Sequence, residues 1–225
     1  MREAIQWDRV DTVMLDMDGT LLDLHYDNHF WFTLIPQTLA EKRSISLDAA
    51  RAYMEEKVSQ HQGTLQWYCL DFWSEQLGIN IIALKKIETE RIRLRQDALS
   101  FLQALARSDK KVWLVTNSHP AGLKIKLSVI DIAVYFDEII SSHQFGYPKE
   151  NTDFWETLQG YRAFDSASSV FIDDSLPVLA CAENYGIAYP ILVETPDSKK
   201  PRNSQSDYLG INHFNELQFE CARDV

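Results

Sequence analysis

Short apolar runs alternate with segments of helical periodicity along most of the chain. The apolar runs predict buried strands at about 12–16, 112–116, 137–141, 169–173 and 188–193. The periodic segments between them predict helices at about 97–108, 120–130, 151–160 and 176–185. Because strands that alternate with helices pair in parallel, we expect an α/β fold with a doubly wound parallel sheet.

A long, purely helical stretch interrupts this alternation after the first strand. Helical periodicity extends over about 27–42, 47–60, 64–78 and 81–95, with Gly63 and Gly78 as end signals. We therefore expect a discontinuous core, formed by residues 1–23 and 97–225, and a helical insertion over residues 24–96. Most aromatic side chains of the insertion are expected to pack between its helices, and one or two to face a cavity. These aromatic residues are Phe30, Trp31, Phe32, Tyr53, Trp67, Tyr68, Phe72 and Trp73.

Polar residues follow three of the predicted strands at the point where each strand ends. Asp16 and Asp18 close the first strand, and alternate residues of a strand point the same way, so both can lean into one crevice. The carboxyl ends of parallel strands are where open α/β sheets bind ligands. Two carboxylates this close repel each other unless a cation or a shared proton relieves them. The pair therefore predicts a hard divalent metal with oxygen ligands, most naturally Mg²⁺.

The later strand ends carry residues suited to a phosphate group. Thr116 and Asn117 supply a hydroxyl and an amide, which are neutral hydrogen-bond donors. Lys149 follows the rigid Pro148 and can present a point positive charge. Taken singly, each feature also has a structural interpretation, as a strand-end turn or a solvated loop lysine. Asp173 and Asp174 end a further apolar strand, and we expect the Asp16 strand to lie centrally, between the strands that carry Thr116 and Asp173.

In this order, the four motifs resemble those of the haloacid dehalogenase superfamily, whose members are mostly aspartate-dependent phosphohydrolases. The first of them, Asp16-Met17-Asp18-Gly19-Thr20, is similar to the family's nucleophile motif. The resemblance implies a Rossmann-like core with a helical cap of the C1 type over the catalytic crevice. It also implies that Asp16 attacks phosphorus to form an aspartyl-phosphate intermediate, and that Asp18 is the general acid and base.

The same resemblance implies roles for the remaining motif residues. Lys149 neutralises the nucleophile and the transferring phosphoryl group, and Thr116 and Asn117 bind the substrate phosphate. Mg²⁺ is held by Asp16, by the backbone carbonyl of Asp18 and by Asp174, whereas Asp173 stands behind these ligands or serves as an alternative ligand. Haloalkanoate dehalogenases lack an acid at the position of Asp18, so its presence favours a phosphohydrolase and leaves a phosphomutase open.

Segments outside the motifs bear on the substrate. Residues 65–78, 145–150 and 171–175 resemble members of the superfamily that hydrolyse purine nucleoside 5′-monophosphates, which implies GMP and IMP as substrates. The aromatic residues of the cap and Tyr147 are candidates for contact with the base. A phosphatase for sugar phosphates or phosphoglycolate is the alternative on the same site. A non-catalytic protein that binds phosphate ligands is the remote one, because binding alone does not require a nucleophile beside an acid.

Composition limits which classes of binding partner and which cellular location we expect for the protein. The net charge of −11 argues against nucleic-acid polymers and anionic membranes as partners. The cysteines Cys69, Cys181 and Cys221 form no Cys-x-x-Cys pattern, and the six histidines form no zinc-protease motif, so we expect reduced thiols and no zinc site. The N-terminus lacks a signal-peptide core, and no apolar run approaches the ~18 residues needed to span a bilayer. We therefore expect a cytoplasmic enzyme, and the sequence leaves its oligomeric state open.

Overall fold

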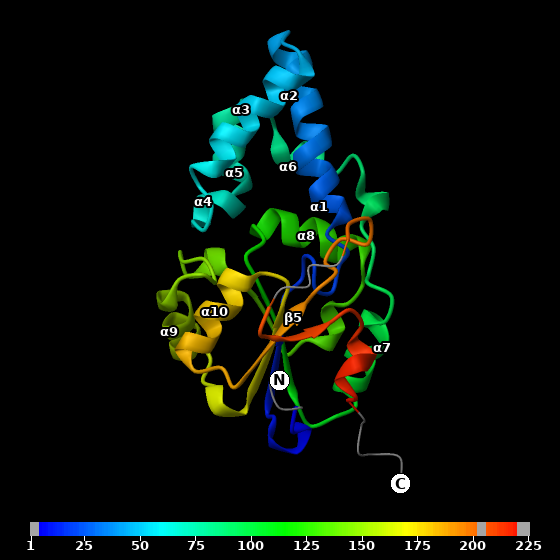
Figure 1. The fold of residues 1–225 in the computed structure, drawn as a ribbon, viewed down its shortest axis with the longest axis vertical. Coiled ribbons are helices and arrows are strands. Elements are labelled where there is room, and N and C mark those ends of the chain that lie inside the picture. The colour runs from blue at the N-terminus through cyan, green and yellow to red at the C-terminus, as the bar shows by residue number, and fades with distance from the viewer. Residues whose placement is uncertain (1–4, 202–205, 220–225) are drawn as a thin grey trace.

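The computed structural model describes residues 5–201 and 206–219. Its centre is a parallel, six-stranded sheet in the order β3-β2-β1-β4-β5-β6 (Figure 1). The strands are β1 (Thr12–Leu15), β2 (Lys111–Thr116), β3 (Glu138–Ser141), β4 (Ser169–Asp173), β5 (Tyr189–Val193) and β6 (Leu209–Ile211). β1 pairs with β2 on one side and β4 on the other, which confirms the predicted central position of the Asp16 strand. The short edge strand β6 was not predicted.

Helices cover both faces of the sheet, as the doubly wound prediction requires. The side chains of Val13 and Leu15 pack with helices α7 (Ala98–Ala106) and α8 (Pro120–Val129) in one hydrophobic cluster. Met14 points the other way and packs with α9 (Thr152–Tyr161) and α10 (Leu176–Tyr185) in a second cluster. Buried β1 therefore has apolar side chains on both faces, and this explains why its sequence is continuously hydrophobic.

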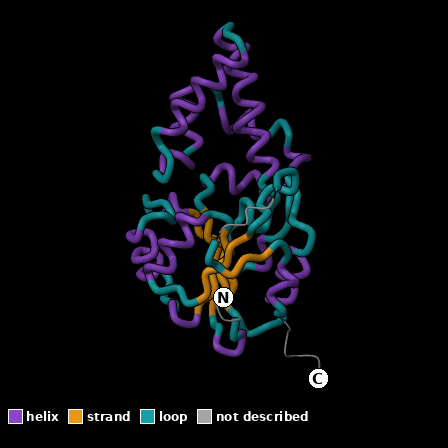
Figure 2. Tube along the Cα trace, in the orientation of Figure 1, coloured by secondary structure: helices purple, strands orange, loops and turns teal. Residues whose placement is uncertain are grey.

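A layer of helices lies above the carboxyl ends of the strands, at the top of Figures 1 and 2. We call it the helical layer; it comprises α1 (His25–His29), η2 (Phe30–Leu34), α2 (Ile35–Arg43), α3 (Leu47–Ser59), α4 (Leu65–Tyr68), α5 (Leu70–Leu77) and α6 (Ile81–Lys85). The first three elements form one continuous helix that widens to a π-turn over Phe30–Leu34. Pro36 lies two residues after this turn, and its missing N–H explains the wider turn. A separate hydrophobic cluster around Leu39, Met54 and Trp73 holds the layer together.

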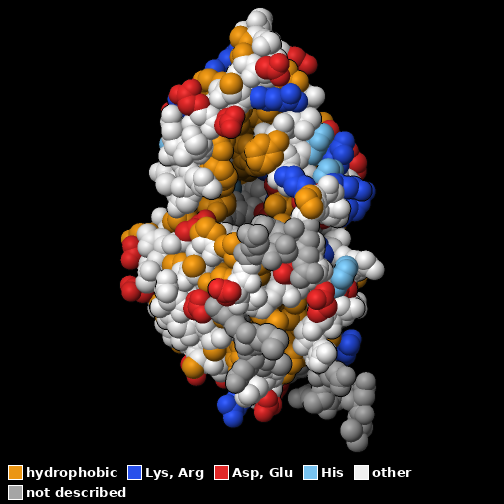
Figure 3. All heavy atoms as spheres, viewed as in Figure 1, with side chains coloured by type: hydrophobic (Ala, Val, Ile, Leu, Met, Phe, Trp, Pro, Cys, Tyr) orange, Lys and Arg blue, Asp and Glu red, His pale blue; other side chains and the backbone are white. Residues whose placement is uncertain are grey.

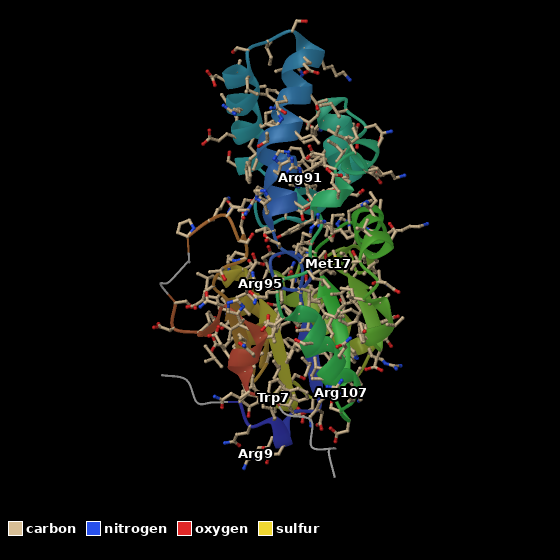
Figure 4. All side chains as sticks on the ribbon, turned by 90° about the vertical axis from the view of Figure 1, so that its right-hand side faces the viewer. Trp7, Arg9, Met17, Arg91, Arg95 and Arg107 are labelled. Carbon is tan, nitrogen blue, oxygen red and sulfur yellow. The ribbon has the colours of Figure 1, made fainter. Side chains whose placement is uncertain are left out.

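The predicted helix over residues 81–95 is wrong in its second half. After α6 only a short 3₁₀ turn, η3 (Thr89–Arg91), interrupts an extended return to the sheet. There the Arg93 carbonyl accepts a hydrogen bond from the Asp23 N–H, and the Arg95 N–H donates to the Leu21 carbonyl. These backbone groups bind the loop after β1 instead of their own helix. Figure 4 shows the course, with Arg91 among the upper helices and Arg95 lower, near the level of Met17.

The other departures from the predicted elements are small. The helix predicted over 64–78 is divided at Cys69, whose backbone is extended between α4 and α5. Short 3₁₀ turns connect the rest: η1 (Trp7–Arg9), η4 (Ala133–Tyr135), η5 (Ser142–Gln144), η6 (Ser166–Ser168) and η7 (Phe214–Leu217). The loop expected after Glu194 is present up to Pro201, while residues 202–205 and Cys221 lie outside the described residues. Within the described ranges, no helix is both long and apolar enough to cross a membrane.

Candidate active site

The loop after β1 holds Asp16 and Asp18 at the carboxyl edge of the sheet. The Asp16 N–H still donates to the Ile172 carbonyl of β4 (3.0 Å), so Asp16 continues the strand alignment and is 6% exposed. The chain then turns sharply at Gly19, where φ is +90°, and the Gly19 N–H donates to the Leu22 carbonyl (2.8 Å). A side chain at Gly19 would collide with Asp174, because its Cβ would lie 2.5 Å from the Oδ2 atom. Glycine thus lets this loop and Asp174 approach each other closely.

Lys149 lies between two of the predicted acids. Its Nζ atom is 2.5 Å from Asp16 Oδ1 and 2.7 Å from Asp173 Oδ2, and it also donates to the Val115 carbonyl (3.0 Å). The side chain is 2% exposed. Burial acts to lower the pKa of Lys149, but the charges of Asp16 and Asp173 outweigh it and raise this pKa above its usual value. Lys149 therefore stays protonated and holds both carboxylates at fixed positions.

The two carboxylates of the last motif have different partners. Both oxygens of Asp173 accept hydrogen bonds, one from the Ser175 N–H (2.8 Å) and the other from Lys149. Among the described residues, no lysine or arginine forms an ion pair with Asp174. Burial, together with the charges of Asp173 and Asp16, raises the pKa of Asp174 well above its usual value. Asp174 is thus a partly buried carboxylate without an ion-pair partner among the described residues.

Thr116 and Asn117 follow β2 and face the same edge. Thr116 is buried, and its hydroxyl accepts a hydrogen bond from the Ser118 N–H (3.0 Å). Both ends of the Asn117 amide are engaged, since Oδ1 accepts from the Lys149 N–H and Nδ2 donates to Glu150 Oε2 (2.9 Å each). Asn117 therefore fixes the loop that carries Lys149. Glu150 in turn accepts a hydrogen bond of 2.5 Å from the hydroxyl of Tyr68, which links α4 of the helical layer to this loop.

Asp18 belongs to a network of two partly buried carboxylates and two buried lysines that the sequence analysis missed. Lys126 Nζ of α8 lies 2.6 Å from Asp18 Oδ1 and 2.6 Å from Asp27 Oδ2 of α1. Lys85 Nζ of α6 lies 2.8 Å from the other oxygen of Asp27. Burial raises the pKa of Asp18 to about 6, although Lys126 acts to lower it. Lys126 occupies the inward face of its helix, one turn after the buried Gly122 and Leu123. A lysine on the apolar face of a predicted helix was the feature of the sequence that could have indicated this network.

The predicted site residues line one cavity between the sheet and the helical layer, with a volume of about 630 Å³. Its lower wall includes Asp16, Asp18, Thr116, Asn117, Lys149, Asp173 and Asp174. Its upper wall is largely apolar and aromatic, and contains Trp31, Phe32, Met54, Val58, Trp67, Tyr68 and Trp73. Figure 3 shows the hollow between the two parts of the molecule, with hydrophobic side chains at its border. Tyr147, a candidate from the sequence, is not among the lining residues.

With this geometry, the chain belongs to the family of haloacid dehalogenase-like hydrolases, whose pattern it matches over residues 10–186. The expected superfamily is thereby confirmed. The chain is similar to the GMP/IMP nucleotidase YrfG of Escherichia coli (strain K12), with 41% identity over 217 residues. That match covers 96% of this chain and 98% of the relative. The GMP/IMP nucleotidase YrfG of Shigella flexneri matches with the same identity and coverage.

Solved structures of the superfamily share the fold. A HAD phosphatase from Thermococcus onnurineus superposes with a TM-score of 0.77 and 19% identity, covering 93% of this chain and 96% of that one. The HAD-hydrolase YfnB from Bacillus subtilis, in a structure bound to magnesium, has a TM-score of 0.65 and 17% identity, covering 93% and 97%. At these identities the likeness concerns the fold, and it confirms the predicted Rossmann-like core.

Proposed function

We propose that the protein is a Mg²⁺-dependent phosphomonoesterase in which Asp16 is the nucleophile. The observation that supports this most is the separate pairing of two neighbouring carboxylates: Asp16 with Lys149, and Asp18 with Lys126. One carboxylate is fixed beside an ammonium group as a nucleophile requires. The other has a pKa raised by burial to about 6, which suits a group that must both donate and accept a proton near neutral pH.

The proposed reaction has two displacements at phosphorus. Asp16 attacks, forming an acyl-phosphate bond, while the bond from phosphorus to the ester oxygen breaks and Asp18 donates a proton to that oxygen. Asp18 then accepts a proton from water, which attacks phosphorus and returns Asp16 as a free carboxylate with release of phosphate. Lys149 and Thr116 would neutralise and orient the phosphoryl oxygens, and Asn117 would support them by fixing the Lys149 loop.

The donor set suits magnesium. Asp16, Asp173 and Asp174 crowd around the single ammonium of Lys149, and Asp174 has no cationic partner among the described residues. Such a cluster of carboxylate oxygens matches the ligands that Mg²⁺ prefers. We propose Asp16, the Asp18 backbone carbonyl and Asp174 as ligands, with Asp173 behind them because Lys149 and Ser175 occupy its oxygens. When bound, the ion would shield the anionic nucleophile from the anionic substrate.

We propose purine nucleoside 5′-monophosphates, GMP and IMP, as the preferred substrates. The relative YrfG bears the name GMP/IMP nucleotidase, and it is similar along nearly the whole chain. The aromatic upper wall of the cavity would accommodate a planar base, with Trp31 and Trp67 as candidates for stacking. In this proposal residues 24–96 act as a cap of the C1 type, whose closure excludes water from the site. A cytoplasmic location stays a prediction from the sequence.

The alternatives concern the leaving group rather than the site. A sugar-phosphate or phosphoglycolate phosphatase would use the same carboxylates, but its substrates have no planar base to stack on the aromatic upper wall of the cavity. A phosphomutase would return the phosphoryl group to a sugar instead of releasing phosphate. A non-catalytic phosphate-binding protein would not need Asp16 fixed beside Lys149 with an acid two residues away.

The test is phosphate release from GMP, IMP, AMP, glucose 6-phosphate and phosphoglycolate in the presence of Mg²⁺, with an excess of chelator as the control. We expect kcat/KM for GMP and IMP to exceed that for the other esters by about tenfold or more, because base contacts can discriminate to this degree. Selectivity for the sugar phosphate or phosphoglycolate would refute the substrate assignment. No release from any ester, or full activity in the chelator, would refute the Mg²⁺-dependent esterase.

A further inference from the structure

A second group of metal-ligating side chains lies where the helical layer meets the core. Cys69 comes from the break between α4 and α5, His119 precedes α8, and His143 lies in η5. One ligand atom from each of the three residues lies within 4.8 Å of the others. The three come from distant parts of the sequence, so their meeting depends on the helical layer and the core being in contact. None of them belongs to the carboxylate cluster of the proposed Mg²⁺ site.

We propose that Cys69, His119 and His143 form a binding site for a thiophilic transition metal such as Zn²⁺. A thiolate with two imidazoles is a ligand set typical of Zn²⁺, whereas Mg²⁺ prefers oxygen ligands. Bond lengths of about 2.3 Å to sulfur and 2.0 Å to nitrogen place tetrahedral ligands ~3.5 Å apart. Side-chain movements of about 1 Å would therefore bring the three ligand atoms from their present separations of up to 4.8 Å to those of a metal site. Asp71 Oδ2, which lies 3.5 Å from His119 Nε2, is within reach as a fourth ligand.

The surroundings of His143 leave one of its ring nitrogens available to bind a metal. Its Nε2 atom is buried and has no hydrogen-bond partner among the described residues. The backbone of Asn117 lies within hydrogen-bonding reach of the imidazole and acts to raise its pKa. A backbone hydrogen bond at one ring nitrogen fixes the tautomer and leaves the other lone pair free, as in known metal sites. Burial also lowers the pKa of His143 to about 4, so the ring is neutral at physiological pH.

The other two side chains are held only loosely at present. His119 Nδ1 accepts from the Ala121 N–H at 3.3 Å, and Nε2 lies 3.5 Å from Asp71, both at the long end for such contacts. Cys69 Sγ accepts from the Phe72 N–H at 3.4 Å and caps α5. Each of these contacts is weak enough to be exchanged for a bond to a metal.

The position of the site gives it a consequence for turnover. Cys69 and Asp71 belong to the helical layer, and the two histidines belong to the core. Close beside them Leu70 packs against α8 at Gly122, where a Cβ would lie 3.5 Å from the leucine. A bound metal would tie the two parts together and oppose the opening that releases product. This consequence, unlike the site itself, rests on the proposed function, and it predicts that Zn²⁺ lowers kcat at saturating Mg²⁺.

The test uses Co²⁺ as the probe, in excess Mg²⁺ to occupy the carboxylate site, and reads the charge-transfer absorption of a Co²⁺–thiolate bond. A Cys181→Ala/Cys221→Ala background leaves Cys69 as the one cysteine of the chain. We expect the absorption to saturate at one Co²⁺ per chain and to be abolished by excess Zn²⁺. Wild-type protein measured in parallel shows whether the background substitutions alter the site.

Two substitutions and one control decide the outcome. Cys69→Ala should abolish the absorption, and His143→Gln should weaken Co²⁺ binding at least tenfold, whereas the distant His213→Gln should leave it unchanged. No thiolate band in the Cys69-only protein, or an unchanged affinity in His143→Gln, would overturn the proposal. Because binding is measured without substrate, failure of the nucleotidase assignment leaves this result intact. Zn²⁺ inhibition that persists in Cys69→Ala would place the inhibitory ion elsewhere and refute the effect on turnover.

Discussion

At the scale of single residues, Lys126 is the charged group closest to Asp18, the proposed general acid and base. Its ammonium is the cation within 2.6 Å of both Asp18 and Asp27, and the side chain is 3% exposed. Asp27 retains Lys85 as a second partner, and although burial opposes it, these two lysines hold the pKa of Asp27 below its usual value. Asp18 has no such second cation among the described residues. Loss of Lys126 would therefore change mainly the pKa of Asp18.

We predict that Lys126→Met lowers kcat by about 10–100-fold and moves the alkaline limb of the pH profile to higher pH. An opposite charge favours the ionised carboxylate, so its removal raises the pKa of Asp18 further above 6, and the acid stays protonated to higher pH. Lys124→Met is the matched control, because Lys124 lies on the exposed face of the same helix. An unshifted alkaline limb in Lys126→Met would show that Lys126 does not act through Asp18.

Individual site residues differed in how far the sequence could predict them. Asp16, Asp18, Asp173 and Asp174 were identifiable because each lies at the end of an apolar strand or within three residues of it. The network of Lys126, Asp27 and Lys85 was not, because its members lie 58 and 99 positions apart and meet only when α1, α6 and α8 are packed. The Cys69, His119 and His143 group was not predicted for the same reason. The expectation that the histidines form no zinc site rested on local spacing alone.

The loop after β1 is the element on which the site's geometry depends most. Gly19 has a positive φ, and its missing side chain gives Asp174 room against the loop. We predict that Gly19→Ala lowers kcat/KM about 100-fold, because a displacement of Asp174 near 1 Å disturbs the proposed Mg²⁺ ligands. Gly63→Ala is the control: its φ is also positive, but nothing lies within 4 Å of the added Cβ. Equal effects of the two substitutions on activity would mean that backbone strain alone, and not Asp174, is responsible.

The elements of the core were predicted more accurately than those of the helical layer. Strands β1 to β5 have apolar cores and distinct ends, so their positions follow from local pattern. The stretch 86–95 has alternating charged and apolar residues that suit a helix equally well. Its true course is set by backbone hydrogen bonds to the distant residues 21–23, which no local pattern contains. The edge strand β6 has three residues, and its one fully buried side chain is Ile211.

For the molecule as a whole, the carboxylate cluster couples stability to Mg²⁺ and pH. Burial raises the pKa values of Asp16 and Asp18 from about 3.8 to about 6, so the folded protein binds more protons than the unfolded chain between these values. The stabilisation from these protons is fully present below pH ~4 and is lost as the pH rises through about 6. Near neutral pH, the metal-free protein thus contains mutually repelling carboxylates that Mg²⁺ would neutralise.

We predict that Mg²⁺ raises the melting temperature clearly at pH 8 and much less at pH 5, where protons compete for Asp16. At a hundredfold excess over Kd, the binding of one ion contributes about 2.7 kcal/mol to the free energy of unfolding. Thermal denaturation with and without Mg²⁺ at both values of pH measures the difference. Asp174→Asn is the control and should show little Mg²⁺ response at either pH. A shift as large at pH 5 as at pH 8 would contradict the proposed ligands.

The central claim is that Asp16 is the nucleophile of a phosphomonoesterase. The most direct measurement is kcat/KM for GMP hydrolysis by wild type and Asp16→Asn in excess Mg²⁺, with circular dichroism to verify the fold of the variant. Because asparagine keeps the shape of the side chain but cannot form the acyl phosphate, we predict a loss of at least about 1,000-fold in a folded protein. Activity of folded Asp16→Asn near that of wild type would contradict the account.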